Sequence, residues 1–92
     1  MDFKIPSKFR LGGREWIVER VGKKKWFGRC NNATCVIELS ARCKNEEEYR
    51  HTFLHELTHA LLYVMGQNTL FEDERFVDGL SSLLLQVIDS GE

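Results

Sequence analysis

The feature that most constrains this chain is an H-E-x-x-H motif, His55-Glu56-Leu57-Thr58-His59, inside a stretch predicted to form one long helix. Residues four apart lie on one face of a helix, one turn above the other. His55 and His59 can therefore offer two imidazole nitrogens to a single Zn²⁺. Glu56 can reach a water at that metal and accept its proton while the water attacks a carbonyl. The motif supplies two ligands and a base, and it requires a helix and a third ligand.

Strong helix signals surround the motif. Asn45 is a favourable N-cap residue, and the three glutamates after it place negative charge where the helix dipole favours it. Glu48 stands three residues after Asn45, which is the spacing of a capping box. Gly66 is the expected end, since neither proline nor glycine interrupts the run before it. Apolar residues at helical spacing predict one buried stripe with both histidines beside it: Phe53, Leu57, Ala60, Leu61 and Val64.

Length and charge narrow the class of protein. The 92 residues, 42% of them hydrophobic, predict a single domain over 1–92 with one core and a loose N-terminal arm at 1–8. A net charge of −1 gives no reason to expect a nucleic-acid partner or an anionic membrane. The chain starts without an apolar secretory segment, and no apolar run reaches the length of a membrane span. We therefore expect a cytoplasmic protein whose partner is a peptide or protein substrate, with its oligomeric state open.

The three cysteines, Cys30, Cys35 and Cys43, are odd in number and form no C-x-x-C pair. This favours reduced, mostly buried thiols over a disulfide framework. A structural zinc site built from the three with His51 is conceivable, but their spacings match no common zinc finger. Their role is left open.

Short segments rich in β-branched and aromatic residues precede the helix and predict a small antiparallel β-meander. Gly12 and Gly13 mark a tight turn between two extended segments. The following strands are expected at residues 15–21, 26–31 and 35–39, with turns at 22–25 and 31–34. The predicted fold class is α+β, a meander followed by two packed helices.

A second helix is predicted to begin near Leu70, because Thr69 and Glu72 have capping-box spacing. Its apolar residues form a stripe that would pack on the first helix and the sheet: Phe76, Val77, Leu80, Leu83, Leu84, Val87 and Ile88.

The missing ligand should lie on this second helix, where Glu72, Asp73, Glu74 and Asp78 are the candidates. Glu72 points away from the apolar stripe, and Asp73 falls within it. Glu74 and Asp78 are four apart on one polar flank, which meets the histidines if the two stripes face each other. We predict Glu74 as the third ligand, and Asp78 as the group that holds a ligating histidine through its other ring nitrogen. Glu72, Asp73 and Asp78 stay open as ligands, and a pair of solvated acids is the plainer alternative for Glu74 and Asp78.

H-E-x-x-H on one helix and Glu74-x-x-x-Asp78 on the next resemble the gluzincin arrangement of zinc metallopeptidases. The short chain, the meander and the closing apolar helix are similar to small phage and prophage zinc peptidases related to the ImmA/IrrE group. The resemblance implies a minimal zincin-like domain that acts in the bacterial host cytoplasm with one Zn²⁺. It implies His55 and His59 as ligands, Glu56 as general base and Glu74 as third ligand.

The resemblance also implies that substrate binds as an added strand along a sheet edge near the metal. Either Trp26–Asn31 or Cys35–Leu39 could be that edge. An oxyanion-stabilising group beyond the metal is expected as well, and Tyr63 and His51 are the polar candidates near the motif. The alternative for His51 is an ordinary surface histidine.

Three functions compete at this stage. The leading hypothesis is a zinc-dependent peptide-bond hydrolase, a metalloprotease of phage or prophage origin. The alternative is a catalytically idle zincin-fold binding module with structural zinc, because one small domain offers little wall for a cleft. The third is a metal-free interaction protein, dimeric through its leucine-rich last helix. Metal analysis separates the third hypothesis from the other two. A metal-free protein would contain no zinc, and a chelator would leave its stability unchanged.

Overall fold

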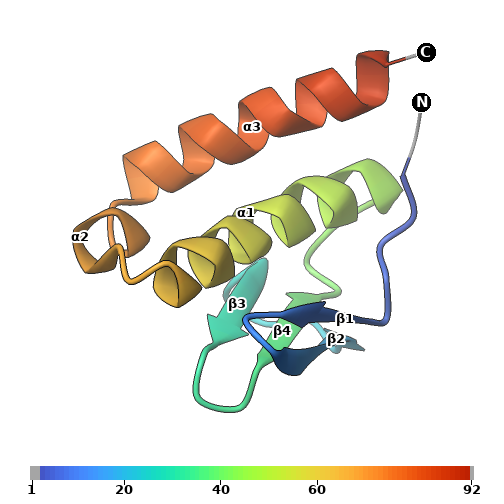
Figure 1. Ribbon diagram of the computed structural model, residues 1–92. Helices are drawn as coiled ribbons and strands as arrows, with labels where there is room; N and C mark the ends of the chain where they lie inside the picture. Colours follow the sequence, from blue (N-terminus) through green and yellow to red (C-terminus); the bar gives the residue numbers. More distant parts are fainter. Residues whose placement is uncertain (1–2, 92) are drawn as a thin grey trace.

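The computed structural model describes residues 3–91 and has the predicted α+β fold, arranged in three layers (Figure 1). The first layer is a four-stranded sheet of β1 (Lys8–Leu11), β2 (Arg14–Val21), β3 (Gly28–Asn31) and β4 (Val36–Ser40). The other elements are α1 (Glu46–Val64), α2 (Asn68–Phe71) and α3 (Glu74–Ser90). Helix α1 lies between the sheet and α3, and the short helix α2 connects the two long ones.

The sheet is mixed, with strand order β1-β2-β4-β3, so the prediction of an antiparallel meander was wrong. Strands β1 and β2 form an antiparallel hairpin, but β2 pairs in parallel with β4, and β3 lies antiparallel at the far edge. The reason lies in the two last strands. Ile37 and Leu39 of β4 are fully buried, which suits an interior strand, whereas β3 carries Arg29 and Asn31 and suits an exposed edge.

The predicted turn at Gly12 and Gly13 is confirmed. Their φ angles are 63° and 77°, the left-handed conformation that a two-residue hairpin turn requires at both positions. The predicted loose arm was wrong in the part that the structure describes. Phe3 and Ile5 pack against the core, and Lys8 already begins β1. Residues 1–2 lie outside the described range.

Helix α1 begins and ends where the sequence predicts. The Asn45 side chain accepts a hydrogen bond from the Glu48 backbone N–H at 2.9 Å. The Glu48 carboxylate in turn accepts one from the Lys44 N–H at 3.0 Å, one residue earlier than in a standard capping box. Gly66 has φ 76° directly after the helix, as a C′ glycine does.

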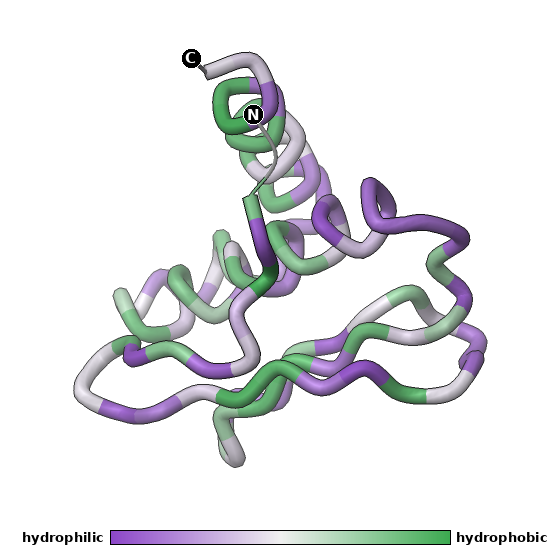
Figure 2. The backbone as a smooth tube through the Cα atoms, turned by 90° about the vertical axis from the view of Figure 1, so that its right-hand side faces the viewer, coloured by the Kyte–Doolittle hydropathy of each residue, from purple (hydrophilic) through white to green (hydrophobic). Residues whose placement is uncertain are grey.

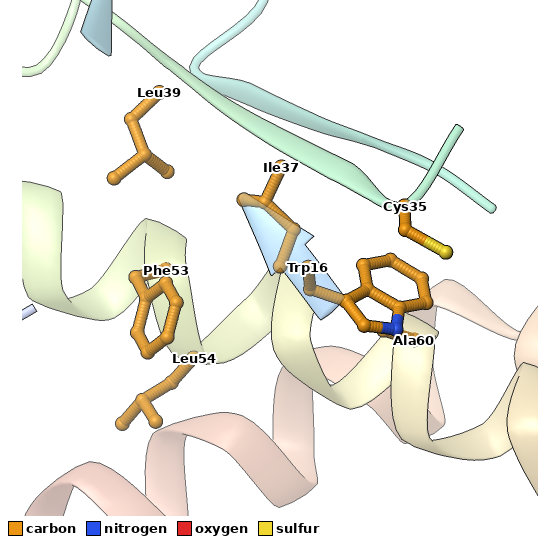
Figure 3. Close-up of a cluster of buried hydrophobic side chains, with 7 residues drawn as sticks. All are labelled: Trp16, Cys35, Ile37, Leu39, Phe53, Leu54 and Ala60. Atoms are coloured by element: carbon orange, nitrogen blue, oxygen red, sulfur yellow. The ribbon is translucent and has the colours of Figure 1, made fainter. Parts of the chain in front are cut away.

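The burial of α1 differs from the predicted single stripe, because this helix is covered on two sides. Figure 3 shows Phe53 and Ala60 of α1 beside core residues of the strands, while Leu54 points away from them towards α3. The cluster comprises Trp16, Cys35, Ile37, Leu39, Phe53, Leu54 and Ala60. Leu61 and Val64, which we expected inside the stripe, are 36% and 41% exposed.

Helix α3 begins later than predicted. Asp73, not Thr69, is its N-cap and accepts a hydrogen bond from the Phe76 N–H at 3.1 Å, so the predicted capping box of Thr69 and Glu72 was wrong. Only Val77 and Ser81 of α3 are buried. Hydrophobic residues recur along the whole helix (Figure 2), and several of them remain exposed on its outer side, with Leu83 at 60% and Val87 at 68%. None of the described helices is both long and apolar enough to cross a membrane.

Candidate metal centre

His55, His59 and Glu74 converge where the first residue of α3 meets the middle of α1. One Glu74 oxygen lies 3.0 Å from His55 Nε2, and the other lies 2.9 Å from His59 Nε2. Within residues 3–91 this is the one group whose ligand atoms, all within 4.8 Å of one another, could hold a metal ion. The structure thus brings together the three residues that the sequence predicted as ligands.

The orientation of His59 is determined by its second ring nitrogen. Nδ1 lies 2.7 Å from the Phe71 carbonyl oxygen, which can only accept, so Nδ1 carries the proton. Its Nε2 lone pair therefore faces Glu74, and two electron-pair donors at that separation need a proton or a cation between them. The Phe71 ring also packs edge-on against the His59 ring, at 5.6 Å between centroids. Helix α2 thus supplies the backbone carbonyl, that of Phe71, which orients the His59 ring.

Asp78 lies beside the other histidine. Its Oδ1 is 3.5 Å from His55 Nδ1, on the opposite side of the ring from Glu74. This is the placement expected for an acid that orients a ligating histidine through its other nitrogen. His51 lies one turn before His55, and its Nε2 is 3.2 Å from Ser82 Oγ. The α3 flank predicted to carry Glu74 and Asp78 therefore does face α1.

Glu56 is buried, with 8% of its surface exposed, and it lines the same cleft as the histidines. Burial, with a smaller contribution from the charge of Glu74, raises the pKa of Glu56 to about 7. A cation held by the three donors would oppose this shift, because a nearby positive charge favours the ionised carboxylate. Gly28 leaves room for Glu56 to lie close to the sheet, because an added Cβ there would lie 3.2 Å from Glu56 Cγ.

The site opens into a cleft of about 1140 Å³ that runs between α1, the start of α3 and the segments flanking β3 and β4. Cys30 lies in its wall, and burial, followed by the charge of Glu56, raises the pKa of this thiol to about 12. Cys30 is therefore a protonated thiol at neutral pH. All three cysteines are free, and they form no metal-binding group with His51 in the described part of the chain.

Some predicted candidates take no part in this centre. Tyr63 does not line the cleft, and its ring packs on Phe71 at 5.8 Å. Asp73 is used as the α3 N-cap, and Glu72 lies outside the cleft wall. Sequence reasoning missed Phe71 and Gly28. Phe71 acts through its backbone carbonyl, which no side-chain pattern reveals, whereas a lone glycine in a strand is a usable signal of close approach.

The donor set fits zinc. Two imidazole nitrogens and one carboxylate are the protein ligands of many catalytic zinc sites, which leave a further position open. The second nitrogen of His59 is at hydrogen-bonding distance from the Phe71 carbonyl, and that of His55 faces an Asp78 carboxylate oxygen 3.5 Å away, as expected for ligands of this kind. His55, His59 and Glu74 are therefore the residues that would hold the ion.

A zincin-like domain is the class that this fold and site define, with an H-E-x-x-H helix lying between a mixed sheet and an acid-bearing helix. Comparison with protein families matches residues 9–76 to the SprT-like family, and the chain belongs to that family. The family is zinc-associated and related to zincin-type metallopeptidases. Comparisons with curated proteins and with solved structures found no match.

Proposed function

We propose that this chain is a zinc-dependent peptide-bond hydrolase. The observation that carries the proposal is the convergence of His55, His59 and Glu74 within 4.8 Å, with Glu56 adjacent in the cleft. A zinc ion there would supply a Lewis acid that polarises a carbonyl and makes a water acidic near neutral pH. The proposal includes three further points. The site is of the gluzincin kind, the chain is of phage or prophage origin and related to the ImmA/IrrE group, and it acts in the cytoplasm.

Glu56 takes the role of general base. It accepts a proton from the attacking water and then donates it to the leaving amine, as a positioned carboxyl group can do on successive steps. Its side chain is buried beside Gly28, where the missing Cβ leaves room for it, so it is packed at the cleft before substrate binds. Asp78 keeps His55 oriented through Nδ1, and Phe71 does the same for His59.

The substrate would lie along β3. The sequence left the choice between two strands open, and β4 is an interior strand whereas β3 is the edge. The free hydrogen-bonding groups of an edge strand can pair with an extended peptide. Because Gly28 and Cys30 of β3 line the cleft with Glu56, a peptide added there would pass the site. His51 lines the cleft as well and is the remaining candidate for stabilising the oxyanion, while we leave Tyr63 out of the mechanism.

The test is a comparison of the parent protein with Glu56→Gln, purified without a histidine tag. Both should carry about one zinc per chain, because Glu56 is not a ligand, and the variant should lose hydrolysis of a peptide library by at least about 100-fold. If Glu56→Gln cleaves as well as the parent, the mechanism is wrong. Zinc in both proteins without turnover by either would favour the idle binding module, in which zinc is structural.

A further inference from the structure

Four cationic residues line the cleft, and we call this set its cationic wall. Lys23, Arg29, Arg42 and Lys44 all line the cavity that contains Glu56 and the metal-binding group. They come from the segment before β3, from β3 itself and from the segment between β4 and α1, and all four side chains are exposed. This concentration does not follow from the overall charge, which is −1.

Most of these cations are not neutralised within the chain. Arg29 pairs with Glu38 at 2.6 Å and lies over the Trp26 ring. Arg42 lies over the Phe27 ring, with 5.0 Å from its guanidinium carbon to the ring centroid. For Lys23, Arg42 and Lys44 the described residues provide no ion-pair partner. These three side chains are therefore available to a ligand.

Four acidic residues also line the cleft; Glu56 is buried, and the other three have partners within the chain. Glu74 contacts both histidines, Asp78 lies against His55, and the Glu48 carboxylate accepts from the Lys44 backbone N–H. A ligand in the cleft would meet the exposed cations of β3 and of the loops beside it. Opposite charge at a rim steers binding and selects between partners, even where each exposed pair contributes little.

We infer that the cleft selects peptide segments with acidic side chains next to the bond to be cleaved. This inference rests on the proposed function, since it assumes a peptide along β3. Alternate side chains of an added strand point to opposite faces, so one set would lie on the side of Arg29 and the loops that carry the lysines. Phe27, 47% exposed, gives the same wall an apolar surface for the stem of a glutamate.

The test uses the Glu56→Gln protein, so that binding is measured without cleavage. The probes are a fluorescein-labelled extended peptide with glutamates at alternate positions, its glutamine counterpart and a labelled oligothymidine. The glutamate peptide should bind at least about fivefold more tightly than the glutamine peptide, and added salt should reduce the difference. Equal binding of the two peptides would overturn the inference, and so would binding of the oligothymidine without a preference for the glutamate peptide.

Charge-reversal variants locate the effect. Lys23→Glu, Arg42→Glu and Lys44→Glu together should weaken binding of the glutamate peptide about tenfold or more, given two- to fivefold for each exposed charge. The matched control replaces Lys4, Lys8 and Lys25 with glutamate. These substitutions change the net charge by the same amount, but the three residues do not line the cleft. An equal loss in the control would mean a long-range field and would refute the assigned wall. If the cleft variant does not fold, the two peptides decide alone.

Failure of this inference is distinguishable from failure of the proposed function. Zinc content and loss of hydrolysis in Glu56→Gln test the function, whereas peptide preference tests the cationic wall. A parent protein that holds zinc and cleaves neutral and acidic peptides equally would keep the function and overturn the preference.

Discussion

At the scale of single residues, the site depends on a few residues that each make contacts in two places. Glu74 begins α3 and contacts both histidines of α1, and His59 uses its second nitrogen to contact the Phe71 carbonyl. Each such residue joins one helix to the next. The close approach of α1 to β3 also depends on a single residue, Gly28, because this residue has no side chain to separate them.

We predict that Gly28→Ala destabilises the protein by about 1–3 kcal/mol, the usual range for overpacking a core. The new Cβ would lie 2.5 Å from Thr52 Cγ2 and 3.2 Å from Glu56 Cγ, so α1 and β3 must separate. Hydrolysis should fall as well, since Glu56 moves. Urea unfolding and peptide cleavage measure the two effects.

The control for this substitution is Gly79→Ala, where no atom lies within 4 Å of the added Cβ and stability should rise by roughly 0.5–1 kcal/mol within the helix. Thr52→Ser removes the contacting methyl and keeps the hydroxyl that lies near Cys43 Sγ. The double variant Gly28→Ala/Thr52→Ser should regain part of the loss. No recovery would show that the contact with Thr52 is not the cause.

At the scale of elements, local signals were predictable and pairings were not. The two ends of α1 are encoded by Asn45 and Gly66, which act within a few residues of themselves. The start of α3 was misplaced because Thr69 and Asp73 are both residue types that can cap a helix, and in the structure Thr69 lies inside α2 while Asp73 caps α3. The order of strands failed for a similar reason, since the parallel pairing of β2 with β4 joins residues far apart in sequence.

Helix α3 leads to a prediction about its two sides. Val77 is fully buried and Leu83 is 60% exposed. Val77→Ala should therefore cost about 1–3 kcal/mol, because it leaves a cavity. Leu83→Ala should change stability by no more than about 0.5 kcal/mol, although it removes more atoms. Urea unfolding of both variants is the measurement. A loss at Leu83 equal to that at Val77 would mean that the outer side of α3 is covered in solution.

At the scale of the whole molecule, the candidate centre lies where α1, α2 and α3 meet. The sequence was sufficient to name the donors, because the spacing in H-E-x-x-H and the flank shared by Glu74 and Asp78 are geometric facts about single helices. It was insufficient to choose the edge strand or to dismiss Tyr63, since both depend on how the layers stack. A ligand bound by residues of two separate helices must also couple their association to its own binding.

Zinc should consequently stabilise the whole fold. At a free concentration about 100 times its Kd, a ligand specific for the native state adds about 2.7 kcal/mol. For a domain of this size that corresponds to a rise in Tm of roughly 10–20 °C. Differential scanning fluorimetry with zinc, and again after chelator, measures it. Glu74→Gln should abolish most of the rise, because it removes the only donor from α3 in the group, whereas Asp78→Asn should retain most of it. An unchanged Tm in the parent protein, with and without chelator, would mean that His55, His59 and Glu74 hold no ion, and the domain would then be a metal-free member of its family.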